Sequence, residues 1–191
     1  MAGEKRMEIL QAAIKIFSKE GFHKAKIDDI AMAAGIGKGT VYQYFSSKQE
    51  LFQEMIKFMM KRYDESIDLI ISKDQGFKDK LLMIAENHVK FVSQHIDMAQ
   101  MIMNQSDLIS KEMKCWIMEQ KEAAYKSFER LVEDGINRGE VRQDIDREIA
   151  ASSIIGTMNQ YYGRKIFRSK EKNRYVDPLP LVDFLSKTLC V

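Results

Sequence analysis

Apolar side chains recur every three or four positions along most of the chain, which is the spacing of an amphipathic helix. The helix-forming residues Leu, Ile, Met, Ala, Lys and Glu fill the sequence, and its only prolines are Pro178 and Pro180. No segment alternates apolar and polar residues over the length of a strand. The pattern therefore predicts an all-α protein.

Gly, Asn, Asp and Ser interrupt this pattern and divide it into about nine helices. The expected helices span about residues 5–19, 27–34, 38–44, 47–71, 77–93, 98–104, 110–138, 146–167 (with Asp144 as an alternative cap) and 178–188. Ser47 to Glu50 matches a capping box, in which the Ser47 hydroxyl accepts a bond from a helix amide and Glu50 accepts one from the amide of Ser47.

Residues 27–44 combine two short helices with a tight turn in which Gly35 provides a positive φ. Apolar residues at the spacing needed to face the first helix are predicted to be core: Ile30, Ala34, Ile36, Val41 and Phe45. The polar side of the third helix then points outward. Because two such short helices need the first one as a lid, the segment predicts a three-helix helix-turn-helix domain whose third helix enters the major groove of DNA.

Charge is distributed unevenly along the chain, which carries a net +2. Residues 1–48 hold eight Lys or Arg against five Asp or Glu, a net +3, which leaves −1 for the remainder. A basic N-terminal segment on a near-neutral body fits a nucleic-acid partner. No apolar run approaches the roughly 20 residues that span a bilayer, and the first residues lack the pattern of a signal peptide. We therefore expect a cytoplasmic protein with no membrane association.

The run from Ile30 to Lys48 resembles the N-terminal motif of the TetR family of transcriptional regulators. It contains an Ile-Ala pair, an Ala-Gly-Ile turn, and Lys-Gly-Thr-Val-Tyr-Gln-Tyr-Phe followed by Lys48, and the resemblance covers residues 5–51. It implies that Thr40, Tyr42 and Tyr44 reach phosphates and that Lys48 holds the DNA backbone. It places Lys38, Gly39 and Gln43 nearest to base edges.

Two positions depart from the family pattern. Lys26 stands where the family usually has a Thr or Ser cap, and Gly37 stands where it often has Ser. A lysine cannot accept the capping bond. Lys26 is therefore expected either to meet a phosphate or to remain solvated beside Asp28 and Asp29.

The same resemblance divides the chain into a DNA-binding domain, residues 1–47, and a ligand-binding and dimerisation domain, residues 48–191. In the family the last two long helices form a four-helix bundle across a two-fold axis, here about residues 146–167 and 178–189. The expected dimer interface comprises Ser152, Gly156, Asn159, Gly163, Leu181, Leu185 and Leu189. The alternative is that these faces pack only within one subunit.

Thirteen methionines are many for 191 residues, and several fall on helices that line the ligand cavity in similar proteins. Adaptable apolar side chains suit a lipophilic ligand, although ordinary core filling is the alternative for each residue. The candidate pocket residues are Met59, Met60, Phe91, His95, Met98, Met101, Met113, Trp116, Tyr125, Phe128 and Tyr162. His88 and His95, two helical turns apart, are candidates for a polar tip of this pocket or for a metal site that lacks a third ligand.

Cys115 and Cys190 have no partner at metal-ligand spacing and are expected to be two buried thiols. No catalytic nucleophile, carboxylate pair or phosphate-binding loop is present, so neither enzymatic activity nor a cofactor is expected. The preferred interpretation is a repressor that binds a pseudo-palindromic operator in double-stranded DNA as a homodimer and is released by a small lipophilic effector. An activator of the same family remains an alternative, as does an enzyme or carrier that uses the methionine-rich cavity.

Overall fold

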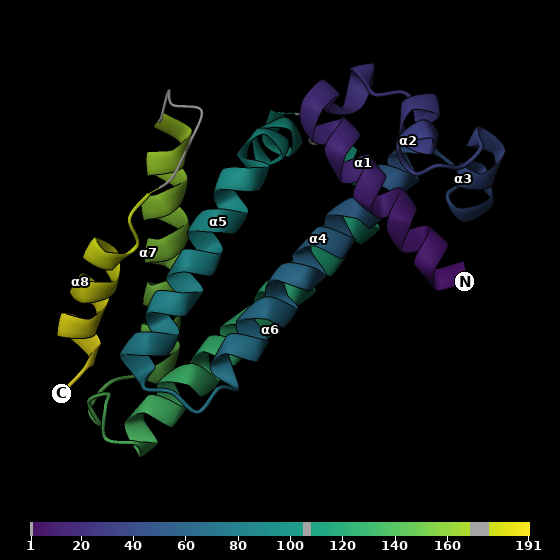
Figure 1. Cartoon of the computed structure of the whole chain (residues 1–191). Helices are drawn as coiled ribbons and strands as arrows, with labels where there is room; N and C mark the ends of the chain where they lie inside the picture. Colours follow the sequence, from purple (N-terminus) through teal and green to yellow (C-terminus); the bar gives the residue numbers. More distant parts are fainter. Residues whose placement is uncertain (1, 105–107, 169–175) are drawn as a thin grey trace. The chain divides into compact units, whose positions relative to one another are not determined.

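The structure, a computed structural model, describes residues 2–104, 108–168 and 176–191, with the backbone alone from residue 96 to 104. It is helical throughout, which confirms the predicted fold class (Figure 1). Within the described residues the helices are α1 (Ala2–Lys24), α2 (Ile27–Ala33), α3 (Lys38–Tyr44), α4 (Lys48–Ile71), α5 (Phe77–Asn104), α6 (Lys111–Asn137), α7 (Arg147–Arg168) and α8 (Leu179–Leu189). None of these helices is long and apolar enough to cross a bilayer.

Two expected helices are one in the structure, so the described residues hold eight helices and not nine. Helix α5 continues through the segment that was expected to separate residues 77–93 from residues 98–104. Residues 94–97 contain neither Gly nor Pro, so nothing there interrupts the helical hydrogen bonds. Helix α1 likewise extends beyond its expected end at Lys19, with a kink at Gly21, whose φ is 73°.

The chain forms two compact units, of which the first comprises Met1–Arg62 and Asp97–Lys114. In this unit α1, α2 and α3 lie together (Figure 1). Its core consists of apolar side chains from α1 to α4, among them Ile9, Phe17, Ile30, Val41, Phe45, Phe52 and Met55, each at most 1% exposed. Leu108, Ile109 and Met113 are also buried. The helix-turn-helix segment is thus held on a fully packed support.

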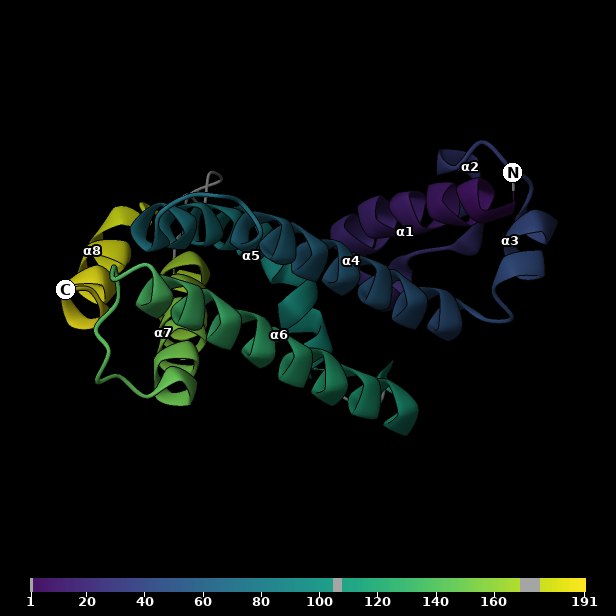
Figure 2. The ribbon, with the colours of Figure 1, turned by 90° about the horizontal axis from the view of Figure 1, so that it is seen from below.

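The second unit comprises Tyr63–Ile96 and Cys115–Val191. Its core combines apolar side chains from the second half of α4 and from α5, α6, α7 and α8. Helices α7 and α8 lie side by side (Figure 2). The buried ammonium of Lys80 pairs with Asp134 at 2.8 Å and lowers the pKa of that carboxyl. The Glu140 carboxylate accepts a bond from the amide of Phe77, which ties the start of α5 to the α6–α7 loop.

Candidate nucleic-acid interface and effector site

The turn between α2 and α3 is built by backbone hydrogen bonds. Gly35 adopts a φ of 65°, its amide bonds to the carbonyl of Met32 at 3.1 Å, and the amide of Ile36 bonds to that of Ala31 at 3.0 Å. This is a Schellman motif, which ends a helix and requires the left-handed conformation that glycine adopts most readily. The turn therefore fixes where α2 ends.

The expected division of α3 into a core side and an outward side is seen in the structure, but two of the five residues expected to be core, both in the turn before α3, are only half-buried. Val41 and Phe45 are 1% exposed and Ile30 is fully buried, while Ala34 and Ile36 are half-buried. On the other side Lys38, Gly39, Tyr42 and Gln43 are exposed, and Thr40 and Tyr44 are half-buried. Six of the eight candidate DNA-contacting residues thus lie on one short helix and face away from the core or stand at its edge.

Lys38, at the start of α3, already has a partner within the unit. Its Nζ lies 2.9 Å from a carboxylate oxygen of Asp28 on α2, with both side chains exposed. The hydrogen bond and the charge of Asp28 raise the pKa of Lys38 above its ordinary value. Lys38 is therefore cationic at neutral pH. To reach a base edge, its ammonium must move away from the carboxylate of Asp28.

Lys48, at the start of α4, is half-buried and braces two helices. Its Nζ donates to the carbonyl oxygen of His23 at 3.1 Å and lies 4.8 Å from the centre of the Phe22 ring. Burial lowers the pKa of this lysine. One ammonium proton of Lys48 is donated to His23, and the other two stay available for a phosphate. Lys26, by contrast, is exposed and makes no capping bond at the N-terminus of α2.

The capping box at the start of α4 differs in one bond from its expected form. The Ser47 hydroxyl accepts from the amide of Glu50 at 3.0 Å, as predicted. The Glu50 carboxylate, however, accepts from the amide and the hydroxyl of Ser46 and not from the amide of Ser47. Glu50 therefore fixes the residue before the cap, which orders the link between α3 and α4.

Sequence reasoning missed Arg6, which connects α1 to α4. Its guanidinium pairs with Glu54, which also accepts from Lys57 at 2.8 Å, and it lies 5.3 Å from the centre of the Phe45 ring. Burial alone would raise the pKa of Glu54, but Lys57 and Arg6 lower it. The partners are 48 residues apart in the sequence, so no local signal marks this pair.

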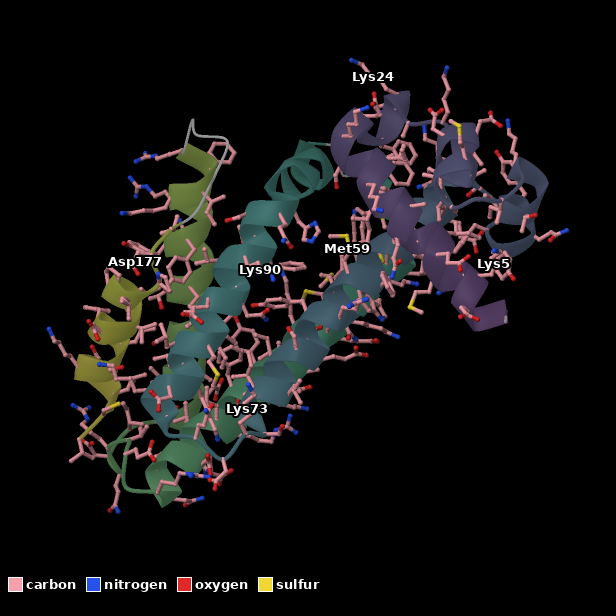
Figure 3. All side chains as sticks on the ribbon, in the orientation of Figure 1. Lys5, Lys24, Met59, Lys73, Lys90 and Asp177 are labelled. Atoms are coloured by element: carbon pink, nitrogen blue, oxygen red, sulfur yellow. The ribbon has the colours of Figure 1, made fainter. Side chains whose placement is uncertain are left out.

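The candidate pocket residues are divided between the two units. Met59 on α4, marked in Figure 3, is buried in the first unit together with Met113, and Met60 is half-buried there. Phe91, His95, Trp116 and Tyr125 are half-buried in the second unit, in which Phe128 and Tyr162 are core residues. The side chains of Met98 and Met101 lie outside the described residues.

Cys115, expected to be buried, is exposed, and Cys190 is half-buried.

An aromatic cluster in the second unit brings together three residues that the sequence marked as candidates and one, Tyr63, that it did not. Tyr63 on α4 meets His88 on α5, with 2.7 Å between its hydroxyl oxygen and Nδ1. The Phe91 ring lies 4.5 Å from that of Tyr63 and 4.9 Å from that of His95, measured between ring centres. Spacing along α5 marks His88 and His95, but Tyr63 lies on another helix and gives no such signal.

A hollow of about 150 Å³ lies between α4 and α6 in the same unit. Tyr63, Ile67 and Phe128 line it together with Ala123 and Ala124, and Asp64 and Asp68 add carboxylates. Asp68 accepts a bond from Ser127 at 2.7 Å. Burial, followed by the charges of Asp68 and Glu65, raises the pKa of Asp64 to about 6. Among the described residues, no group of His, Cys, Asp and Glu is arranged to hold a metal ion.

The expected dimer-interface residues lie in two different environments. On α7, Ser152, Gly156 and Asn159 are exposed and Gly163 is half-buried. On α8, Leu181, Leu185 and Leu189 are at most 8% exposed and belong to the core of their own unit. The three leucines pack inward because they occupy the core-facing side of α8, whereas its outward-facing apolar residues are Leu179 and Phe184, at 47% and 61% exposed.

Two family models match the sequence. One, described as bacterial regulatory proteins of the tetR family, matches residues 9–55, and the other, described as a tetracyclin repressor-like C-terminal domain, matches residues 74–163. The fatty acid metabolism regulator protein of Bacillus subtilis is 26% identical over 159 residues, which cover 82% of this chain and 80% of that protein. The transcriptional repressor KstR2 of Mycobacterium tuberculosis is 26% identical over 160 residues, or 80% of this chain and 77% of that protein.

Solved structures share the fold. The transcriptional regulator FadR from Bacillus subtilis, solved in complex with stearoyl-CoA, superposes with a TM-score of 0.68 over 95% of each chain at 23% identity. At that identity the likeness concerns the arrangement of helices and carries nothing about the ligand.

Proposed function

The chain belongs to the TetR family of bacterial transcriptional regulators, and from this membership we propose that it is a repressor that binds its operator as a homodimer and is released by a small lipophilic molecule. Regulation through DNA is the activity of the family, whose members are not enzymes. The exposed polar side of α3, held on the buried side chains of Ile30, Val41 and Phe45, is the observation that carries the proposal. In helix-turn-helix proteins the recognition helix, held in this way, inserts into the major groove.

In this proposal the DNA contacts are divided by role. Thr40, Tyr42 and Tyr44 contact phosphates, and Lys38, Gly39 and Gln43 lie nearest to base edges. Lys48 adds a phosphate contact from the start of α4, and Lys26 adds one before α2. This division is supported by the exposure of α3 and by the position of Lys48 in the link that Glu50 orders.

The proposed dimer forms through the outward sides of α7 and α8. A Cβ added to Gly156 or to Gly163 would meet no other atom within 4 Å, so packing within the chain does not require glycine at either position. Ile149 and Phe167 continue the same side of α7 at helical spacing and are 67% and 64% exposed. A second copy of the chain would cover this apolar surface and exploit the close approach that two glycines permit.

The proposed effector is lipophilic and binds in the second unit. One relative is named as a regulator of fatty acid metabolism and another as a transcriptional repressor. In addition, the aromatic cluster of the second unit is partly exposed. Release requires the effector to bind better to the conformer whose recognition helices have the wrong spacing. A coupling of about 1 to 3 kcal/mol would change operator affinity roughly 5- to 150-fold. Helix α4, which contributes residues to both units, is the proposed transmitter.

Selection of binding sequences from a random duplex library, followed by fluorescence anisotropy on the selected duplex, tests the DNA-binding proposal. We expect a two-fold symmetric site bound at least about 1,000-fold more tightly than random DNA at the same salt concentration. Titration of the complex with palmitoyl-CoA, palmitate and a matched set of shorter lipids then tests release. Equal affinity for selected and random duplexes would contradict operator recognition.

A further inference from the structure

His88 is a buried histidine with one ring nitrogen unsatisfied. It is 6% exposed, and its Nδ1 meets the hydroxyl of Tyr63. None of the described residues offers a hydrogen-bond partner to its buried Nε2. Burying a polar group without a partner costs free energy, so native proteins satisfy nearly all such groups. The bond that this nitrogen lacks must therefore come from outside the described residues, as a bound ligand would supply it.

Hydrogen-bond accounting identifies what kind of partner Nε2 needs. Burial raises the pKa of Tyr63, so its hydroxyl keeps its proton and must donate it. Its partner among the described residues is Nδ1 of His88, so Nδ1 accepts. Burial lowers the pKa of His88 to about 4, and the ring is therefore neutral at pH 7. A neutral imidazole that accepts at Nδ1 carries its single proton on Nε2. The missing partner is an acceptor.

The surroundings favour an acceptor without charge. The rings of Tyr63 and Tyr162 lie 5.9 and 6.0 Å from that of His88. Asp64, next to Tyr63, is half-buried, and among the described residues no lysine or arginine lies within ion-pair distance of it. An anionic ligand head bound at His88 would lose its hydration, and the negative charge of Asp64 in the same unit would disfavour it. A carbonyl oxygen accepts the same bond with a much smaller loss of hydration and without charge repulsion.

Space for the apolar part of such a ligand adjoins Tyr63. The hollow lined by Tyr63, Ile67 and Phe128 has a volume of about 150 Å³. Polar side chains also line it, those of Asp64, Asp68, Gln120 and Ser127. A cavity of about this size accepts a molecule such as benzene, so the hollow has room for roughly six carbon atoms. Tyr63 thus takes part in two features at once, because its hydroxyl bonds to His88 and the residue is one of those that line the hollow.

We propose that Nε2–H of His88 donates a hydrogen bond to an uncharged carbonyl oxygen of the effector, which is a ketone, ester or thioester and not a free carboxylate. Tyr63 is a positioning residue that fixes the imidazole tautomer, and the hydrocarbon part of the ligand packs against its ring and fills the adjoining hollow. This inference rests on the proposed function only in identifying the bound molecule as the effector.

A matched series of eight-carbon probes tests the choice of head group on the full chain. The probes are 2-octanone, octanoate, octylamine and n-octane, and their affinities are measured at pH 7.5 by displacement of a fluorescent apolar dye, without DNA. We expect 2-octanone to bind about tenfold more tightly than octane, because one hydrogen bond to the unpaired Nε2–H of His88 contributes roughly that factor. Octanoate and octylamine are expected to bind less tightly than 2-octanone. A preference for either charged probe, or no binding by 2-octanone, would overturn the proposal.

His88→Leu separates ligand recognition from structure. We expect it to abolish the preference for 2-octanone over octane while retaining octane binding, which would show that the variant is folded. His23→Leu, an exposed histidine in the other unit, is the matched control and should keep the preference. An unchanged preference in His88→Leu would refute the anchoring role.

Two spectroscopic readouts do not depend on any variant. The carbonyl stretch of bound 2-octanone should move to lower frequency, as it does when the oxygen accepts a hydrogen bond. Nitrogen-15 spectra should show His88 protonated on Nε2, and a proton on Nδ1 would contradict the tautomer. If 2-octanone binds through His88 but never affects DNA affinity, this site stands and the proposed regulation fails. If another lipid releases DNA equally from His88→Leu, the regulation stands and this site fails.

Discussion

Single residues in the DNA-binding unit combine support and recognition to different degrees. Lys48 donates to the carbonyl oxygen of His23 and lies over Phe22, so part of its contribution is to hold α1 against α4. Gln43 is exposed on α3 and has no such supporting role among the described contacts. Substitutions at these two positions should therefore have different consequences for stability as well as for DNA binding.

Lys48→Ala should weaken binding to all duplexes alike and flatten the dependence of log affinity on log salt by about one unit, since one phosphate contact is lost. It should also lower the free energy of unfolding slightly. Gln43→Ala should leave stability and the salt slope unchanged but reduce discrimination between the selected duplex and its single-base variants. Anisotropy over a salt series measures both. Identical behaviour of the two variants would place α3 outside the groove.

Two titratable residues in the second unit give opposite pH dependences of stability. The folded-state pKa of His88 is about 4, below its ordinary 6.5, so its contribution is complete above pH 6.5 and is lost as the pH falls towards 4. The folded-state pKa of Asp64 is about 6, above its ordinary 3.8, so folding gains stability from it as the pH falls from 6 to 4. Between pH 6 and 4 the two contributions oppose each other.

Urea unfolding of variants between pH 7.5 and 4.5 checks these signs. Relative to the parent, His88→Leu should become progressively more stable as the pH falls below 6.5, by at most about 1.4 kcal/mol per pH unit. Asp64→Asn should become progressively less stable relative to the parent below pH 6. Parallel curves for the parent and both variants would show that neither pKa is shifted.

At the scale of helices, the reliable sequence signals were those with a local cause. Gly35 and the apolar spacing of Ile30, Val41 and Phe45 predicted the helix-turn-helix segment because turn and core are specified within 20 residues. The expected break in α5 had no such cause, and the helix continues. Contacts between helices, such as Arg6 with Glu54 and Tyr63 with His88, join residues 48 and 25 positions apart, and helical periodicity does not encode them.

Helix α4 also holds the segment that precedes α6 through two neighbouring glutamines. The side-chain amides of Gln49 and Gln53 donate to the carbonyl oxygen of Leu108 at 3.3 and 3.0 Å. Leu108 is 6% exposed, so its carbonyl depends on these donors. The bond from Gln53 is the shorter, and it should contribute more to stability than the bond from Gln49.

Gln53→Ala should therefore lower the free energy of unfolding by about 1 kcal/mol. The double variant Gln49→Ala with Gln53→Ala should cost more than the sum of the single changes, because only then is the carbonyl left without a partner. Gln11→Ala, an exposed glutamine on α1, serves as the control and should have little effect. Additive single effects in a urea double-mutant cycle would mean that the carbonyl finds another donor.

For the whole molecule, the sequence predicted a dimer interface on α7 and α8, which stays a proposal, but did not separate the outward and inward sides of these helices. Leu181, Leu185 and Leu189 are apolar at helical spacing, a pattern shared by any buried helix face. Ile149 and Phe167 are equally apolar but exposed. The packing of the other helices decides which apolar residues of α7 and α8 are buried and which stay exposed. The local sequence of a helix does not encode that packing.

The glycines of α7 therefore provide the sharper test of assembly. Gly156→Gln should leave the monomer folded, since the added side chain enters open space and glutamine favours helix over glycine. In a dimer the same side chain would separate the two copies of α7. Sedimentation should show a marked shift towards monomer, and affinity for a two-half-site duplex should fall towards that for a single half-site.

Lys165→Gln places the same side chain on the opposite side of α7, where the lysine lies over Tyr161, and it should leave the dimer intact. Because both variants carry glutamine on one helix, a difference between them reports position and not chemistry. Loss of assembly in both variants would indicate that α7 itself is disturbed. Retention of the dimer in Gly156→Gln, with unchanged half-site cooperativity, would move the interface away from the glycine side of α7 and leave its exposed Ile149 and Phe167 without a partner.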